Sequence, residues 1–264
     1  MAATPPLSIA EVERILRALA PIAQDRSAVL VGGQAVAFWA RFLGILDARP
    51  ALAPLLSKDI DFEGTGEAAR RAADLLGGSV RIPSFDNHTP NTGVVVFVDG
   101  EGIDRKIDFL QAPLGLRSED VLATAVAMVI EEIAGIGTVP LLVMHPERCM
   151  ESCVYNVQIL GRVDDVAIRK LSASILAARA WSRLLLGDES IPERQRVRAV
   201  LGLNERIFRK CHGDFRFRVL FAERGVDPFD AVLVDDDRLP ERFRDRRYPQ
   251  MAEQLAGRRR PADA

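Results

Sequence analysis

Aspartates alternate with apolar residues at two places in the first half of the chain. Asp59 and Asp61 flank Ile60, and Asp108 stands between Ile107 and Phe109. Successive side chains of a β-strand point to opposite faces, so both patterns predict strands with acids on one face and core residues on the other. Two acids on one strand face lie roughly 6.6 Å apart, and such carboxylates can converge on one or two divalent ions. The residue types and their spacing therefore indicate a metal-dependent site.

A pair of glycines precedes these acids in the sequence. Gly32 and Gly33 follow the apolar run 28–31 and open an apolar pattern with helical spacing. A turn between a strand and a helix presents free backbone N–H groups to phosphate, and the missing Cβ allows close approach. With three carboxylates as hard oxygen ligands for Mg²⁺, the combination predicts nucleotidyl transfer. The alternative for either part alone is an ordinary turn or a solvated strand face.

The elements that must position these residues follow from the hydrophobic periodicity. Ser8 and Glu11 form a capping-box pattern at the start of a helix expected over residues 8–24. A second helix is expected over 66–76, ending at Gly77. Further strands are expected over 58–62, 80–82, 94–98 and 105–110, and near 126–131 and 139–144.

The later part of the chain has mainly helical periodicity. It continues from residue 145 to about 186 and again across 192–211. We therefore expect an α/β (α+β) domain over residues 1–144, with a mixed sheet flanked by helices, followed by a helical domain over 145–240. Residues 241–264 are basic and are expected to form a flexible tail.

Composition excludes several broad classes of protein. The chain has 264 residues, is 48% hydrophobic and carries a formal charge of −2, so there is no global signal for nucleic acid or acidic lipid. The longest apolar runs are about ten residues, short of the roughly 20 needed to span a bilayer. Three cysteines and no secretory signal pattern predict a reduced, cytoplasmic protein without membrane contact.

Over residues 28–110 the chain resembles the nucleotidyltransferases of the DNA polymerase beta-like superfamily. The resemblance is carried by Val31-Gly32-Gly33-Gln34, by Asp59-Ile60-Asp61-Phe62 and by Ile107-Asp108-Phe109. It is nearest to the bacterial minimal and the abortive-infection type II toxin-like enzymes, which also have a helical C-terminal part.

The resemblance implies transfer of a nucleoside monophosphate from an NTP such as ATP to an acceptor. The acceptor would be an RNA such as a tRNA end, a protein or a small molecule. Asp59, Asp61 and Asp108 would hold Mg²⁺, with two ions expected, and Asp108 is also the candidate base. The residues expected to bind the nucleotide are Gly32, Gly33, Gln34 and Lys58.

Two departures from the family pattern keep alternatives open. Gln34 follows the second glycine where the family usually has a hydroxyl, and Glu151-Ser152-Cys153 lies where toxin-like members carry a lysine. One alternative is a catalytically silent member that binds a nucleotide or a partner, as in a toxin–antitoxin pair. Another is an RNA-binding regulator acting through residues 194–218, which hold eight basic and two acidic residues. The polar segment 86–93 is either an ordinary turn or a loop that faces the substrate.

Overall fold

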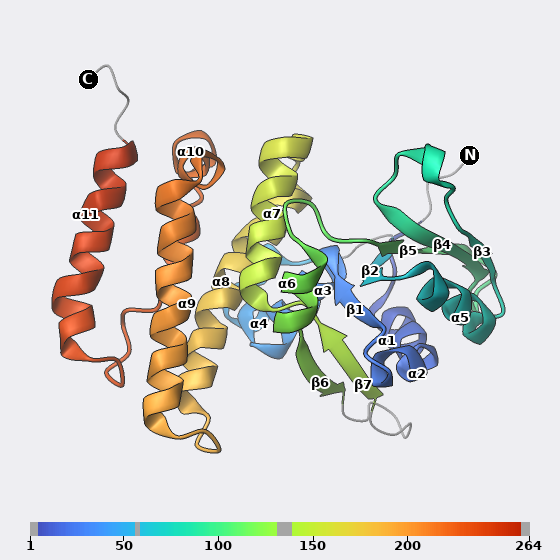
Figure 1. Cartoon of the computed structure of the whole chain (residues 1–264), viewed down its shortest axis with the longest axis horizontal. Coiled ribbons are helices and arrows are strands. Elements are labelled where there is room, and N and C mark those ends of the chain that lie inside the picture. Colours follow the sequence, from blue (N-terminus) through green and yellow to red (C-terminus); the bar gives the residue numbers. More distant parts are fainter. Residues whose placement is uncertain (1–4, 56–58, 131–138, 260–264) are drawn as a thin grey trace. The chain divides into compact units, whose positions relative to one another are not determined.

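The chain folds into two compact units in the computed structural model, which describes residues 5–55, 59–130 and 139–259. The first unit consists of Met1–Phe38 and Pro54–Ser152, and the second of Trp39–Ala53 and Cys153–Ala264. All the strands of the described residues belong to the first unit, whereas the second is helical (Figure 1).

The first unit is built on a mixed seven-stranded sheet. Its strands are β1 (Ala28–Val31), β2 (Ile60–Gly64), β3 (Ser79–Arg81), β4 (Asn91–Val98), β5 (Asp104–Leu110), β6 (Val126–Ile130) and β7 (Val139–Val143). The order across the sheet is β3-β4-β5-β2-β1-β7-β6. The pairs β2–β5 and β1–β7 are parallel, and the other neighbours are antiparallel. The expected mixed sheet flanked by helices is thereby confirmed.

Three helices of the first unit pack against this sheet: α1 (Ile9–Ala18), α2 (Ala20–Gln24) and α5 (Gly66–Leu76). The capping box of Ser8 and Glu11 is formed at the start of α1. One helix over 8–24 was expected, but the chain bends at Leu19 because Pro21, in the first turn of α2, has no N–H to continue the helix. The C-cap of α5 is Gly77, in the left-handed conformation.

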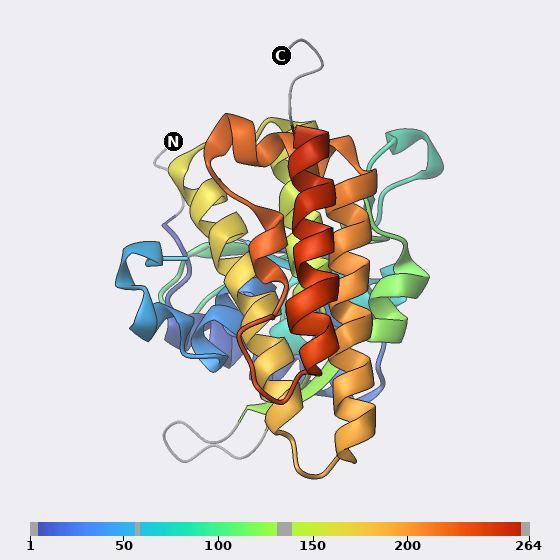
Figure 2. The ribbon, with the colours of Figure 1, turned by 90° about the vertical axis from the view of Figure 1, so that its left-hand side faces the viewer.

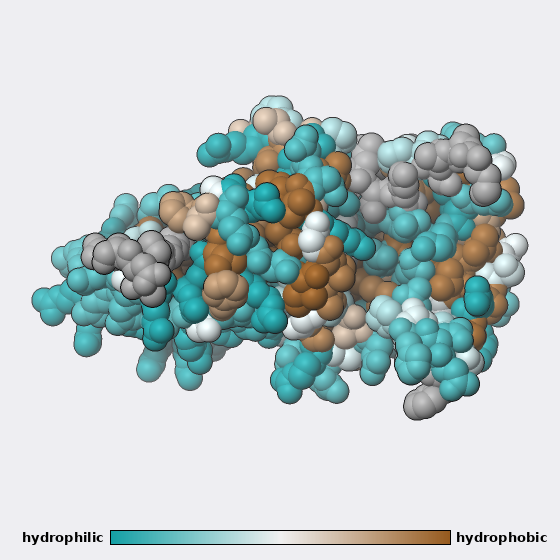
Figure 3. Space-filling model, turned by 90° about the horizontal axis from the view of Figure 1, so that it is seen from above, coloured by the Kyte–Doolittle hydropathy of each residue, from teal (hydrophilic) through white to brown (hydrophobic). Residues whose placement is uncertain are grey.

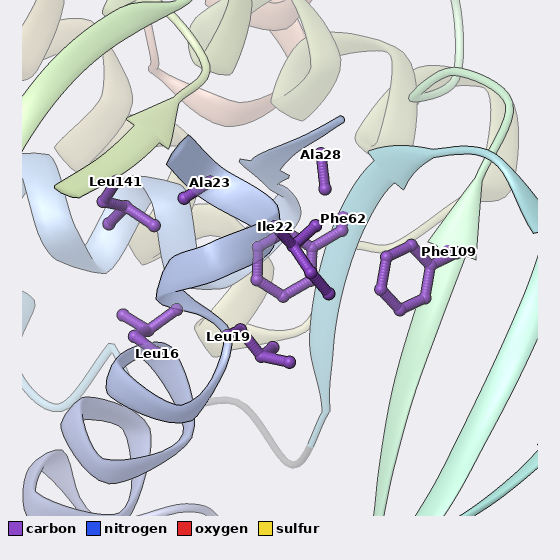
Figure 4. Close-up of a pocket in the computed structure, with 8 residues that line it drawn as sticks. All are labelled: Leu16, Leu19, Ile22, Ala23, Ala28, Phe62, Phe109 and Leu141. Atoms are coloured by element: carbon purple, nitrogen blue, oxygen red, sulfur yellow. The ribbon is translucent and has the colours of Figure 1, made fainter. Parts of the chain in front are cut away.

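Figure 4 shows a small cavity between α1, α2 and the sheet. Apolar side chains line it: Leu16, Leu19, Ile22, Ala23, Ala28, Phe62, Phe109 and Leu141. Its volume of about 10 Å³ is room for at most about one water molecule, whereas small-molecule sites occupy roughly 300 Å³ or more. The cavity is a packing gap in the core and is too small to be a ligand site.

A buried ion network ties the N-terminal segment to the β4–β5 hairpin. Arg105 is only 3% exposed, and its guanidinium contacts Asp99 at 2.8 Å and Glu11 at 2.6 Å. The same guanidinium donates to the carbonyl of Pro5 at 2.7 Å. Asp99 also accepts two backbone N–H groups of its own turn, so both partners of Arg105 are held in place. A charge buried in this way is tolerated because each partner is hydrogen-bonded.

The remaining helices include two that contribute residues to both units, α3 (Gly32–Phe42) and α7 (Pro146–Leu160). Short elements of the first unit are η2 (Phe85–Asn87) and α6 (Ser118–Thr124). The second unit contains α4 (Ile45–Ala48), η1 (Pro50–Leu52), α8 (Asp165–Gly187), α9 (Glu193–Gly213), α10 (Phe215–Arg224), η3 (Pro228–Ala231), η4 (Phe243–Arg247) and α11 (Tyr248–Arg259). Figure 2 shows α8, α9 and α11 running alongside one another.

The C-terminal segment differs from the flexible tail expected over residues 241–264. Its described part forms η4 and α11, with Phe243, Met251 and Leu255 buried. Met251 and Leu255 are four residues apart, so they share one helix face and form its apolar contact. In the sequence this pair is hard to recognise because charged residues surround it.

The molecular surface is mixed. The face in Figure 3 is largely hydrophilic, with apolar residues gathered in patches among the polar ones. Within the described residues, no helix is both long and apolar enough to cross a membrane.

The Arg105 network predicts a stability effect. Replacing Arg105 with Met should cost about 3–5 kcal/mol, because two buried carboxylates lose their partner, and this corresponds to a fall of roughly 10 °C in Tm. Arg81→Met on the exposed strand β3 is the matched control, and thermal unfolding of both variants measures the difference. Equal melting temperatures would show that the network does not support the fold.

Acid should weaken the same network. The hydrogen bond from the Ile103 N–H lowers the pKa of Asp99, and hydrogen bonds from Ser8 lower the pKa of Glu11. Because the folded-state pKa lies below the unfolded value of about 4, both carboxylates stabilise the fold above pH 4 and lose that effect as the pH falls through the lowered values. Urea unfolding at pH 7 and pH 3 should show this loss, and Asp99→Asn should flatten the pH dependence.

Candidate functional site

The strand pairing brings two of the predicted acids together. Asp61 of β2 lies opposite Asp108 of β5 in the parallel register of these neighbouring strands. On the other side, Asp61 pairs with Val31, the last residue of β1. Both aspartates are half-buried. Apolar neighbours of the two acids are at most 4% exposed and point to the opposite face: Ile60, Phe62, Ile107 and Phe109.

Asp59 lies just before β2, and not inside a strand over 58–62 as expected. The pairing of β2 begins one residue later, with Ile60 opposite Ile107 of β5 and Asp61 opposite Val31 of β1. Asp59 is half-buried beside the start of the strand. Lys58, expected to bind the nucleotide, lies outside the described residues, and its role stays a prediction.

Gly32 is placed directly against Asp61. Its φ of +63° is a left-handed conformation, and a Cβ added here would lie 2.4 Å from Asp61 Oδ2 and 3.1 Å from Asp61 Cβ. A side chain is therefore excluded both by backbone strain and by the aspartate. Gly33 follows in the first turn of α3. Gly32 and Asp61 are 29 residues apart in the sequence. The fold brings them into contact, so that the glycine pair and the acids form one continuous surface.

Gln34, the third residue of α3, is buried and only 6% exposed. Its amide nitrogen Nε2 has no hydrogen-bond partner among the described residues. A buried amide donor without a partner is unfavourable, so this side chain has unused hydrogen-bonding capacity. Its expected contact with a nucleotide stays a prediction.

Asp108 is held by two side chains that sequence reasoning did not assign to the site. Asn91 Nδ2 donates to Asp108 Oδ1 at 3.1 Å, and Lys106 Nζ lies 2.8 Å from Asp108 Oδ2. Asn91 is the first residue of β4 and belongs to the polar segment for which a substrate-facing role was considered. Lys106 lies two residues before Asp108 on β5, so the alternation that located Asp108 could also have located Lys106.

The Lys106 ammonium is influenced by all three aspartates. Desolvation disfavours its charged form, but the hydrogen bond to Asp108 and the charges of Asp108, Asp59 and Asp61 outweigh that effect and raise the pKa of Lys106. The three acids and the lysine therefore form one electrostatic group, which we call the acid cluster: Asp59, Asp61 and Asp108, with Lys106 as its cation.

A fourth acid, Glu63, shares the strand face of Asp61. It is 4% exposed, and its Oε1 accepts a hydrogen bond from Ser118 Oγ at 2.6 Å. Its other oxygen, Oε2, is buried without a hydrogen-bond partner among the described residues. Burial raises the pKa of Glu63, because it disfavours the charged carboxylate.

The residue types of the acid cluster suit a hard divalent cation such as Mg²⁺, which prefers carboxylate oxygens and retained waters. Gly32 lies on the same surface, where the missing Cβ lets Asp61 approach the glycine backbone closely. In the described part of the chain, however, no three His, Cys, Asp or Glu side chains are already arranged so that they could hold a metal ion together.

The basic segment 194–218 belongs to α9 and α10 in the second unit. Part of its charge is used internally. Arg196 donates to the carbonyl of Leu186 at 2.9 Å, and Arg218 donates to the carbonyl of His212. Other arginines of the segment are exposed: Arg194, Arg198, Arg206, Arg209 and Arg216. RNA contact through this segment stays a prediction.

Comparison with family models, with curated proteins and with solved structures gave no match to this chain. What the site can do is therefore inferred from its own residues and their geometry.

The contact between Gly32 and Asp61 predicts a difference between two glycine variants. Gly77 has nearly the same φ, +62°, but nothing lies within 4 Å of a Cβ added there. Gly77→Ala should cost only the left-handed strain of about 1–2 kcal/mol. Gly32→Ala should cost about 1–3 kcal/mol more, because the methyl group also meets Asp61.

Urea unfolding of the two variants measures this difference, and Asp61→Ala supplies the coupling test. The excess cost of Gly32→Ala should shrink in the Asp61→Ala background, where the carboxylate is gone. Equal costs for Gly32→Ala and Gly77→Ala would contradict the close contact.

Proposed function

We propose that the protein is a Mg²⁺-dependent nucleotidyltransferase, which moves a nucleoside monophosphate from an NTP to a hydroxyl of an RNA, a protein or a small molecule. One observation carries the proposal. Asp61 and Asp108 are paired in register on neighbouring parallel strands, and Gly32, at the start of α3, lies against Asp61. Nucleotidyl transfer needs carboxylates for the metal next to N–H groups for the phosphates, and this arrangement supports that combination.

The roles divide between two parts of this surface. Asp59, Asp61 and Asp108 would hold the metal, which supplies neutralising charge for the triphosphate and lowers the pKa of the attacking hydroxyl. Gly32 and Gly33 would offer backbone N–H groups at the N-terminus of α3 to the outgoing phosphates. Asp108 is also the candidate acceptor of the hydroxyl proton.

The proposal predicts transfer of label from NTP. Purified protein is incubated with each α-labelled NTP, Mg²⁺ and, in separate reactions, total RNA, protein extract and small-molecule extract. Asp61→Asn or Asp108→Asn should lower the rate roughly a hundredfold or more, because each removes a metal ligand worth several kcal/mol to the transition state. Asp104→Asn, an exposed acid at the start of β5, is the matched control and should behave as wild type.

The outcomes separate the alternatives. Transfer that is unchanged in Asp61→Asn would contradict the proposed site. No transfer with any acceptor, together with thermal stabilisation by NTP and Mg²⁺ that Asp61→Asn abolishes, would instead identify a catalytically silent, nucleotide-binding protein. Salt-dependent RNA binding that survives Asp61→Asn but is lost on Arg198→Ala would indicate the RNA-binding alternative.

A further inference from the structure

Both carboxylate oxygens of Asp108 are already engaged. Asn91 donates to Oδ1 and Lys106 contacts Oδ2. Each oxygen keeps a lone pair for a further ligand, but a cation that approaches Oδ2 meets the ammonium charge at close range. The two contacts differ in kind, since the amide is neutral and the ammonium carries a full positive charge. The Lys106 ammonium therefore places a positive charge at Asp108 Oδ2. A metal ion bound to that oxygen would supply the same kind of charge.

Strand geometry explains why Lys106 contacts Asp108 and feels the charges of Asp59 and Asp61. Lys106 and Asp108 are two apart on β5, so their side chains leave the same face of the strand. The parallel register sets Ile60 beside Ile107. Asp59 and Lys106 are the residues just before these two, so they lie at the same end of the strand pair. The raised pKa of Lys106, with contributions from Asp59 and Asp61, is consistent with this placement.

We propose that Lys106 is an internal counter-ion that regulates metal binding at the acid cluster, because its ammonium already neutralises Asp108 at Oδ2 and repels a divalent cation that approaches that oxygen. This inference rests on the proposed function, and it concerns displacement of a charged group with no change in its protonation. The lysine side chain is 43% exposed, whereas that of Asp108 is 13% exposed. The ammonium can therefore move toward solvent while the aspartate stays in place, as a flexible four-carbon stem allows.

A purely structural salt bridge would behave differently. Removing the lysine of a partly exposed pair changes stability little, and a pair that serves only the fold has no influence on metal affinity. A counter-ion that competes with the metal has the opposite signature. Its removal takes one positive charge away from the acid cluster and frees Asp108 Oδ2, so metal binds more tightly and stabilises the protein more strongly.

The test measures Mn²⁺ binding by isothermal titration calorimetry at fixed ionic strength, without nucleotide. Lys106→Gln should bind Mn²⁺ roughly tenfold more tightly than wild type, because a positive charge no longer competes for the acids. Lys106→Arg, which keeps the charge, should remain close to wild type. Arg81→Gln removes one positive charge from an exposed residue of β3 and should leave the affinity unchanged.

Two further variants locate the effect. Asp61→Asn should weaken Mn²⁺ binding, which assigns the measured site to the acid cluster. The gain in Mn²⁺ affinity from Lys106→Gln should be smaller in the Asp108→Asn background, because Lys106 then has no carboxylate at position 108 to neutralise. If Lys106→Gln fails to fold, Lys106→Met provides the same loss of charge with a side chain of similar length.

The result that overturns the inference is distinct from failure of the proposed function. Equal or weaker Mn²⁺ affinity in folded Lys106→Gln, with wild-type binding that depends on Asp61, would overturn the counter-ion role and leave the metal site standing. No Mn²⁺ binding by wild type or by any variant would contradict the proposed function and the inference together.

Discussion

The in-register parallel pairing of β2 with β5 is the constraint on which the rest of the site depends. It sets Asp61 beside Asp108 and, in the same register, places Ile60 beside Ile107 and Phe62 beside Phe109. The stacked rings of Phe62 and Phe109, 5.5 Å apart, belong to the buried face. A slip of one residue would turn the acids into the core and the rings outward. Hydrophobic burial on one face therefore specifies the alignment of the carboxylates on the other.

Two neighbouring residues near the start of β5, Arg105 and Lys106, show two uses of positive charge. Arg105 faces the core and its ion pairs with Asp99 and Glu11 are buried, as suits a fixed part of the fold. Lys106, the next residue, faces the acid cluster and remains 43% exposed. The planar guanidinium suits several fixed partners at once, whereas the flexible ammonium suits a contact that can be exchanged. Alternation along a single strand thus separates a structural cation from an exchangeable one.

Local patterns in the sequence predicted those features that depend on neighbouring residues. The capping box at Ser8, the left-handed Gly77 and the alternation around Asp61 each follow from a few consecutive positions. Features that depend on distant partners were missed. Strand β2 starts after Asp59 because its pairing with β5 begins at Ile60, and α11 is held by burial of apolar side chains that its charged sequence obscures. The alternation on β5 places Lys106 on the same face as Asp108, but only the folded structure shows that its ammonium contacts that carboxylate.

The close approach of Gly32 to Asp61 connects the two halves of the proposed chemistry physically. A phosphate bound at the start of α3 and a cation held by Asp61 would share one surface, so their opposite charges would stabilise each other at short range. Farther along the same strand face, burial raises the pKa of Glu63. Asp59 and Asp61 lie at the beginning of β2, near the glycine turn, and Asp108 with Lys106 lies beside them on β5. On the proposed function, a divalent cation entering this surface would be attracted by the three acids and opposed by the positive charge of Lys106.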